Sequence, residues 1–209
     1  MNVFIDNRKD GLVLKFEGGN HWNFYDWSPY LDGELHGMED AIPDLMINLL
    51  FILALQNLRE IALKIGKSFA YEDLLKESKK RANEAFYNAG VGLYSMTMGG
   101  NEYTVLGNAL AILAGLELDK EYVCEKIVNG ELSDCSLSMK IFKYDALLAT
   151  DKEKYQEWVL NEIRRAIQSG KRKMGRAHSI MRAAFVTVGV LFLFLICLCW
   201  NRQIEGGNE

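Results

Sequence analysis

The sequence has few of the cysteine and histidine residues that bind metal ions or form disulfide bonds. Its 209 residues include four cysteines and three histidines, and they do not show the CxxC…CxxC spacing of a zinc site. Four cysteines are too few for a disulfide scaffold in a chain of this length. The motifs GxSxG, GxxxxGK[ST] and GxGxxG after a strand are also missing. We therefore expect no metal and no cofactor.

Proline is also scarce, with two residues, whereas the chain holds nine tyrosines and ten phenylalanines. Apolar residues make up 49% of the sequence and charged residues 25%. Such a composition is ordinary for a globular protein and excludes a disordered or fibrous chain. These features favour a packed, mostly helical body of one domain or slightly more.

Clustered positive charge is missing from most of the chain. Residues 1–163 carry 16 basic and 26 acidic side chains, whereas residues 164–209 carry eight basic and two acidic ones. Binding to nucleic acid needs clustered lysine and arginine, so the acidic part argues against nucleic acid as a partner. The composition changes abruptly near residue 164.

The C-terminal part contains an uncharged apolar run, residues 183–200. Its length reaches the lower end of the ~17–25 apolar residues that cross a bilayer. Read literally, residues 166–182 form a basic linker, 183–200 a single-pass membrane anchor with a cytoplasmic basic flank, and 201–209 a polar tail. The first residues do not read as a signal peptide, so without this anchor we expect a cytoplasmic protein.

Residues 1–165 read as two kinds of helix that alternate. Helices that are apolar on most faces, and hence buried, are expected at 43–65, 103–116 and 137–149. Helices with one apolar and one charged face are expected at 70–89, 119–129 and 151–165. Gly66 and Asp119 stand where a helix-ending glycine and a helix N-cap are expected. The alternation predicts an inner and an outer layer, as in a helical barrel; a plain bundle would be amphipathic throughout, and no strict repeat suggests a solenoid.

The segment 18–33, GGNHWNFYDWSPYLDG, is unusually rich in aromatic residues. Tryptophan rings stack on the apolar faces of sugars, and a carboxylate beside them can accept hydrogen bonds from hydroxyl groups. Glycines flank the segment, as is typical of a carbohydrate subsite. The alternative is an aromatic cluster that plugs the mouth of the barrel and binds nothing.

Four segments resemble the bacterial α-L-rhamnosidases, which are six-hairpin glycoside hydrolases, and they follow the order of that family. Residues 18–33 are similar to its W-x-F-x-D-W segment, and residues 43–62 to its helix with an L-x-x-ALQ signature. GNALAILAGL at 107–116 is similar to its NAL-x-x-x-AGI helix, and residues 138–164 to its Y-x-x-F-x-L-EAL segment and the following helix. The resemblance covers residues 1–165.

The resemblance implies an all-α fold: a partial (α/α)6 barrel over 1–165, followed by the apolar C-terminal helix. It also implies inverting hydrolysis of terminal α-L-rhamnosides, in which one carboxylic acid protonates the leaving oxygen and a second carboxylate, ~6.5–9.5 Å away, activates water. Trp22, Asp26 and Trp27, together with His21, would shape the pocket for the terminal sugar.

Neither catalytic carboxylate of the family has a counterpart in this chain, so no catalytic residue is assigned. The family's general acid lies well before the W-x-F-x-D-W segment. Its general base lies in a W-E-T segment followed by A-G-S-L-C-H-G-W-S-A-x-P, which residues 166–209 do not contain. Residues 169–194 permit both motifs in a shifted reading frame, which predicts a frameshift near residue 165.

These features predict a truncated fragment that is inactive alone and carries about three of the six hairpins. A partner chain would have to supply the rest of the barrel. The alternative is a tail-anchored membrane protein with a helical carbohydrate-binding domain.

Overall fold

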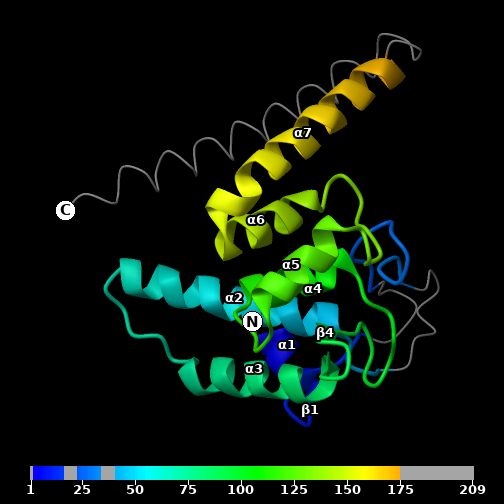
Figure 1. Ribbon diagram of the computed structural model, residues 1–209. Coiled ribbons are helices and arrows are strands. Elements are labelled where there is room, and N and C mark those ends of the chain that lie inside the picture. Colours follow the sequence, from blue (N-terminus) through cyan, green and yellow to red (C-terminus); the bar gives the residue numbers. More distant parts are fainter. Residues whose placement is uncertain (1, 17–22, 34–40, 175–209) are drawn as a thin grey trace. The chain divides into compact units, whose positions relative to one another are not determined.

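The computed structural model describes residues 2–16, 23–33 and 41–174 (Figure 1). The chain forms two compact units, residues 1–156 and 157–209, and the second is described over 157–174. His21, Trp22 and the apolar run 183–200 lie outside the described residues.

The described residues form seven helices and two short antiparallel hairpins. The helices are α1 (Asn2–Asp6), α2 (Leu45–Lys64), α3 (Glu72–Phe86), α4 (Val105–Leu113), α5 (Lys120–Val128), α6 (Lys140–Thr150) and α7 (Lys152–Met174). The first hairpin pairs β1 (Arg8–Lys9) with β2 (Leu12–Val13), and the second pairs β3 (Tyr87–Asn88) with β4 (Leu93–Tyr94). The mostly helical body expected from the sequence is confirmed.

All six predicted helices occur, and α7 continues beyond residue 165 to Met174. The two predicted helix ends are also confirmed. Gly66 follows α2 with φ +70°, and the next N–H, of Lys67, donates to the carbonyl of Ala62 at 2.8 Å. Asp119 caps α5 by accepting a hydrogen bond from the N–H of Tyr122 at 2.9 Å. Each cap satisfies backbone groups that a helix leaves unpaired at its ends.

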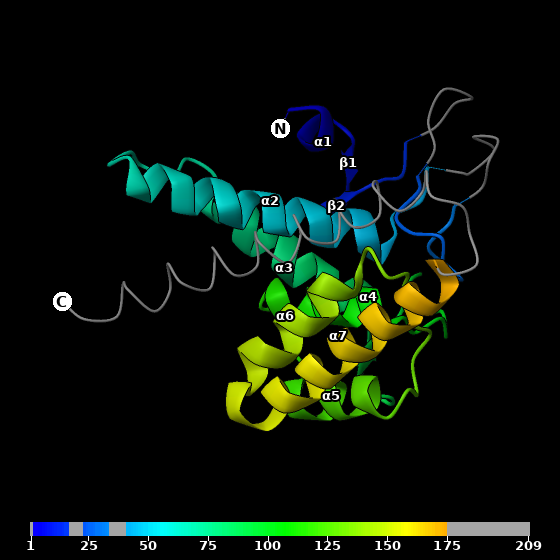
Figure 2. The ribbon, with the colours of Figure 1, turned by 90° about the horizontal axis from the view of Figure 1, so that it is seen from above.

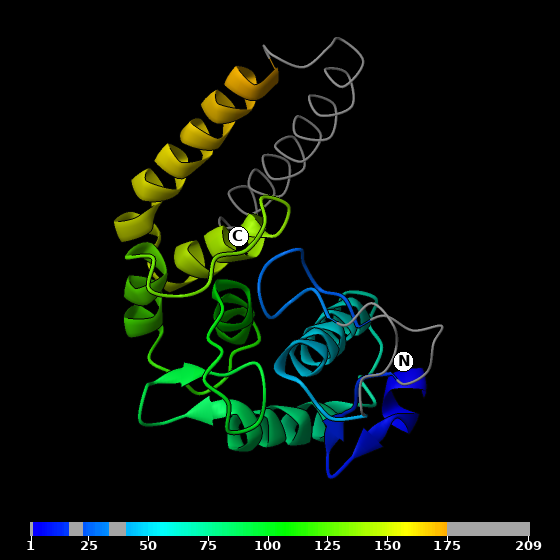
Figure 3. The ribbon, with the colours of Figure 1, turned by 90° about the vertical axis from the view of Figure 1, so that its right-hand side faces the viewer.

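The first unit has an inner row of three helices. In this row α4 lies between α2 and α6, as Figures 2 and 3 show from two directions. The amphipathic helix α3 packs on α2, and α5 packs on α4 and α6. Every residue of α4 from Val105 to Ile112 is buried, as its apolar sequence predicts. Within the described residues the inner helices form an open row and not a closed ring.

One described helix, α2, is long and apolar enough to cross a membrane. Half of its most apolar window is buried inside the protein, against neighbours that include α3 and α4. A core helix passes the same test, so α2 is weak evidence for a membrane span. It also lies in the middle of the chain and not in the C-terminal segment that the sequence suggests as an anchor.

Two helices of the inner row hold the preceding hairpin in the same way. In α2, the side chain of Asn48 accepts a hydrogen bond from the N–H of Val13 at 2.9 Å and donates to the carbonyl of Val13 at 3.0 Å. In α4, Asn108 makes the same pair of bonds with Tyr94, at 2.9 and 3.0 Å. Each asparagine also donates to the carbonyl of the N-cap residue of its own helix. We call this arrangement the asparagine clamp; it satisfies both backbone groups of a buried strand residue.

Candidate functional site

The three inner helices begin at the same end of the first unit. The N–H of Leu45, the first residue of α2, donates to the carbonyl of Met96 in the loop before α4, at 3.0 Å. The N–H of Val105, the first residue of α4, donates to the carbonyl of Ser133 in the loop before α6, at 2.8 Å. These bonds bring together the N-terminal ends of α2, α4 and α6. At such an end, the first backbone N–H groups of a helix have no partner within the helix. We call this end of the first unit the joined end.

Residues 23–33, which we call the aromatic loop, close on themselves at the joined end. The N–H groups of Tyr25 and Asp26 both donate to the carbonyl of Leu31, at 2.9 and 3.0 Å. The side chain of Leu31 is fully buried and holds the loop against the core. Tyr30 has φ +69°, a left-handed conformation that lets the chain turn back just before Leu31.

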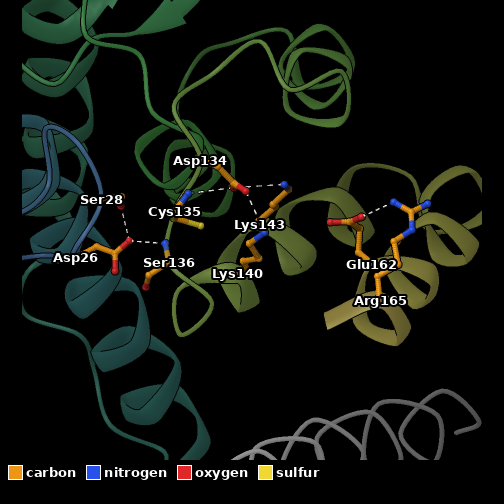
Figure 4. A network of polar contacts seen from close by, with 9 residues as sticks. All are labelled: Asp26, Ser28, Asp134, Cys135, Ser136, Lys140, Lys143, Glu162 and Arg165. Carbon is orange, nitrogen blue, oxygen red and sulfur yellow. Dashed lines mark hydrogen bonds and ion pairs between the residues drawn. The ribbon is translucent and has the colours of Figure 1, made fainter. Parts of the chain in front are cut away.

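Two side chains fix the aromatic loop to the starts of α2 and α6. The hydroxyl of Tyr25 donates to Asp44, the N-cap of α2, at 2.9 Å. The carboxylate of Asp26 accepts the N–H of Ser136, just before α6, at 2.7 Å, and the hydroxyl of Ser28 at 2.5 Å (Figure 4). Asp26 thus joins two segments that are 110 residues apart in the sequence.

Asp26 is buried, with 1% of its surface exposed. Burial by itself would raise the pKa of its carboxyl group. The hydrogen bonds from Ser136, Ser28 and the N–H of Trp27 outweigh burial and hold this pKa below its ordinary value. Asp26 is therefore a charged anchor of the loop, and its predicted contact with a substrate stays a prediction.

Trp27 points the other way. Its surface is 74% exposed, and that of Tyr30 is 59% exposed. The ring of Trp27 packs against Phe24 with a centroid separation of 4.6 Å and an interplanar angle of 59°. Of the four predicted site residues, the structure therefore describes two: Asp26 faces inward and Trp27 faces outward. The result is an anchored loop that presents an indole face to solvent.

A charged cluster lies at the start of α6 and is connected to the aromatic loop through the bond between Ser136 and Asp26. The residue pattern of the sequence did not identify this cluster. The carboxylate of Asp134 pairs with Lys140 at 2.9 Å and with Lys143 at 3.4 Å, and accepts the N–H of Cys135 at 3.0 Å (Figure 4). Burial would raise the pKa of Asp134, but the two lysines hold it below its ordinary value. The carboxylate is therefore ionised at neutral pH.

The signal that points to this cluster is the position of Lys143 in its helix. It is the fourth residue after the N-cap of α6, where α2 and α4 carry the clamp residues Asn48 and Asn108. In the sequence alone, a lysine within a helix does not indicate a site. Comparison with α2 and α4 shows that Lys143 stands where those helices carry an asparagine.

A separate surface pocket of about 460 Å³ lies between the first hairpin and α3. Its lining includes Lys9, Pro43 and Arg81, and none of the aromatic-loop residues. The guanidinium of Arg81 is already engaged, because it donates to the carbonyl of Asp10 at 2.7 Å and pairs with Glu84 at 2.8 Å. We therefore place the candidate site at the joined end.

In the part of the chain that the structure describes, no three His, Cys, Asp or Glu side chains are grouped to hold a metal ion. Cys135 lies beside Asp134, but burial raises the pKa of its thiol to about 11, which leaves little reactive thiolate at neutral pH.

No protein-family model matches the chain, and no curated protein is significantly similar to it.

Proposed function

We propose that the chain is part of a glycoside hydrolase of the α-L-rhamnosidase type and carries one wall of the pocket for a terminal α-L-rhamnoside. The observation that supports this most is the position of the aromatic loop. The segment similar to W-x-F-x-D-W is anchored to the starts of α2 and α6 and turns Trp27 outward. Carbohydrate binding uses such exposed aromatic faces beside fixed polar groups.

The other three segments of the resemblance fall on the inner row and, for the third segment, also on α7. Residues 43–62 fall on α2, 107–116 on α4, and 138–164 on α6 and the start of α7. This order supports a partial (α/α)6 barrel in which α2, α4 and α6 are inner helices and α3 and α5 are outer helices.

We expect binding without turnover. The purified protein should release no product from an aryl α-L-rhamnoside, because its residues include no counterpart of the family's general acid and base. It should bind methyl α-L-rhamnoside weakly, with Trp27→Ala lowering the affinity about tenfold through loss of roughly 1.4 kcal/mol of stacking. Titration calorimetry and a chromogenic assay measure the two quantities.

The matched control is Tyr122→Ala, which removes a partly exposed aromatic ring on α5, outside the aromatic loop. It should leave the affinity unchanged. Rhamnoside hydrolysis by the purified protein would show that the catalytic acid and base lie in this chain. Absence of rhamnoside binding would overturn the proposed function.

The apolar run 183–200 supports a second proposal, membrane contact through a single C-terminal segment. Its lack of charge and the basic residues before it are the features of a cytoplasm-facing anchor. We expect the full chain to sediment with membranes, to resist a high-salt wash and to be extracted as a folded, monodisperse protein by detergent. The paired substitution Leu193→Lys and Leu195→Lys should release it, and a wild-type chain found in the soluble fraction would contradict the anchor.

We also propose that this run arose from a shifted reading frame near residue 165. The nucleotide sequence over codons 160–200 tests this directly. A W-E-T segment followed by A-G-S-L-C-H-G-W-S-A-x-P in another frame would support the proposal, and its absence would refute it.

A further inference from the structure

The third inner helix, α6, has no asparagine clamp. The described segment directly before α6, residues 129–139, forms no hairpin. It is joined to the start of α4 through a bridge between Ser133 and Thr104. At the clamp position stands Lys143, whose residue surface is 5% exposed. Burying an ammonium group is costly unless it is paired, and its pairing with Asp134 offsets that cost. A neutral side chain at this position would avoid the cost altogether.

The lysines and the aspartate of this cluster differ in exposure. The side chains of Lys143 and Lys140 are 6% and 21% exposed, whereas that of Asp134 is 49% exposed. The cations therefore lie on the inner side and the carboxylate on the outer side. A carboxylate has roughly four acceptor positions. Lys140, Lys143 and the N–H of Cys135 use three of them, so Asp134 can accept a further hydrogen bond from solvent or from a ligand.

One short segment links this carboxylate to the aromatic loop. Ser136, two residues after Asp134, donates its N–H to Asp26, and Asp26 immediately precedes Trp27 (Figure 4). The bond between Asp26 and Ser136 thus ties the backbone segment that carries Trp27 to the one that carries Asp134. A flat apolar face and an ionised, partly exposed acceptor are complementary to a neutral polyhydroxylated ligand, because such a ligand has C–H faces and hydroxyl donors.

We infer that Asp134, held in place by Lys140 and Lys143, is the hydroxyl-binding part of the carbohydrate site whose stacking part is Trp27. This inference rests on the proposed function and adds to it a second group of site residues. Asp134 accepts a hydrogen bond from a hydroxyl group of the bound sugar, and Lys140 acts by holding Asp134 in place. Lys143 is a positioning residue that acts through Asp134.

The test is titration of the full chain with methyl α-L-rhamnoside, in a zwitterionic detergent that has no sugar headgroup. Asp134→Asn keeps the shape of the side chain and removes its charge, and we expect it to weaken binding at least tenfold. Lys140→Met should weaken binding severalfold. The matched control is Glu131→Gln, a carboxylate of the same loop that pairs with Lys126, and it should leave the affinity unchanged. Circular dichroism of each variant checks that the helices are intact.

A series of monodeoxy rhamnosides separates direct contact from a structural role. Removal of the hydroxyl that Asp134 binds should weaken binding to the wild type about tenfold and should have no further effect on Asp134→Asn. Equal losses in both proteins would overturn the inference. If Trp27→Ala abolishes binding while Asp134→Asn stays within twofold of the wild type, the inference fails and the proposed function stands. If the wild type does not bind the rhamnoside, both fail.

Discussion

Replacing Asn108 with alanine is expected to lower the free energy of unfolding by about 3 kcal/mol, because a buried donor or acceptor left without a partner costs roughly 1–3 kcal/mol. Asn108 is fully buried, and so is Tyr94, whose backbone N–H and carbonyl it satisfies. Alanine would leave both groups unpaired in the core. The hairpin of β3 and β4 would lose the bonds that hold it at the start of α4. Chemical denaturation followed by far-ultraviolet circular dichroism measures the change.

The control is Asn129→Ala, at the exposed end of α5, where the amide makes a long bond of 3.3 Å to Glu131. Exposed substitutions of this kind change stability by about 0.5 kcal/mol or less. Asn48→Ala removes the equivalent clamp on Val13 and should destabilise the protein about as much as Asn108→Ala does. If Asn108→Ala is as mild as the control, the clamp does not stabilise the first unit.

The sequence predicted the helices well because their apolar patterns extend over several turns. The run from Leu45 to Leu55 is apolar on most faces, and most of these residues are buried in the structure. The hairpins were not predicted, because strands of two residues are too short for alternation to appear. In the sequence, Asn48 only interrupts the apolar run from Leu45 to Leu55. Its role became visible once the structure placed it opposite Val13 and placed Asn108 opposite Tyr94.

The candidate site was predictable in part. The density of aromatic residues indicates the loop as a candidate site, and the structure shows Trp27 exposed there. Its contact with a sugar stays a prediction. Composition could not show that Asp26 turns inward, because the group that holds it, Ser136, is 110 residues away in the sequence. The pairing of Asp134 with Lys143 spans nine residues, but it depends on how the loop before α6 folds back on the helix, which the residue pattern does not show. Contacts between distant loops depend on tertiary packing, which the local residue pattern does not encode.

Loss of the Asp26 carboxylate is the second change for which we expect a large effect. Asp26→Ala should lower the free energy of unfolding by about 2–3 kcal/mol at neutral pH, because the N–H of Ser136 and the hydroxyl of Ser28 would lose their buried acceptor. The aromatic loop would also lose its connection to the segment before α6. We therefore expect rhamnoside affinity to fall together with stability.

The pH dependence distinguishes a charged anchor from a simple packing contact. Because the pKa of Asp26 is lowered in the folded protein from 3.8, its stabilising contribution is complete well above pH 3.8 and is lost as the pH falls through the lower, folded value. The stability difference between the wild type and Asp26→Asn should therefore be constant near neutral pH and shrink in acid. Glu60→Gln, which changes an exposed carboxylate on α2, is the control and should differ little from the wild type at neutral pH. A difference that persists unchanged below pH 3 would mean that Asp26 stabilises the loop by its shape, and a difference absent at pH 7 would mean that it does not anchor the loop at all.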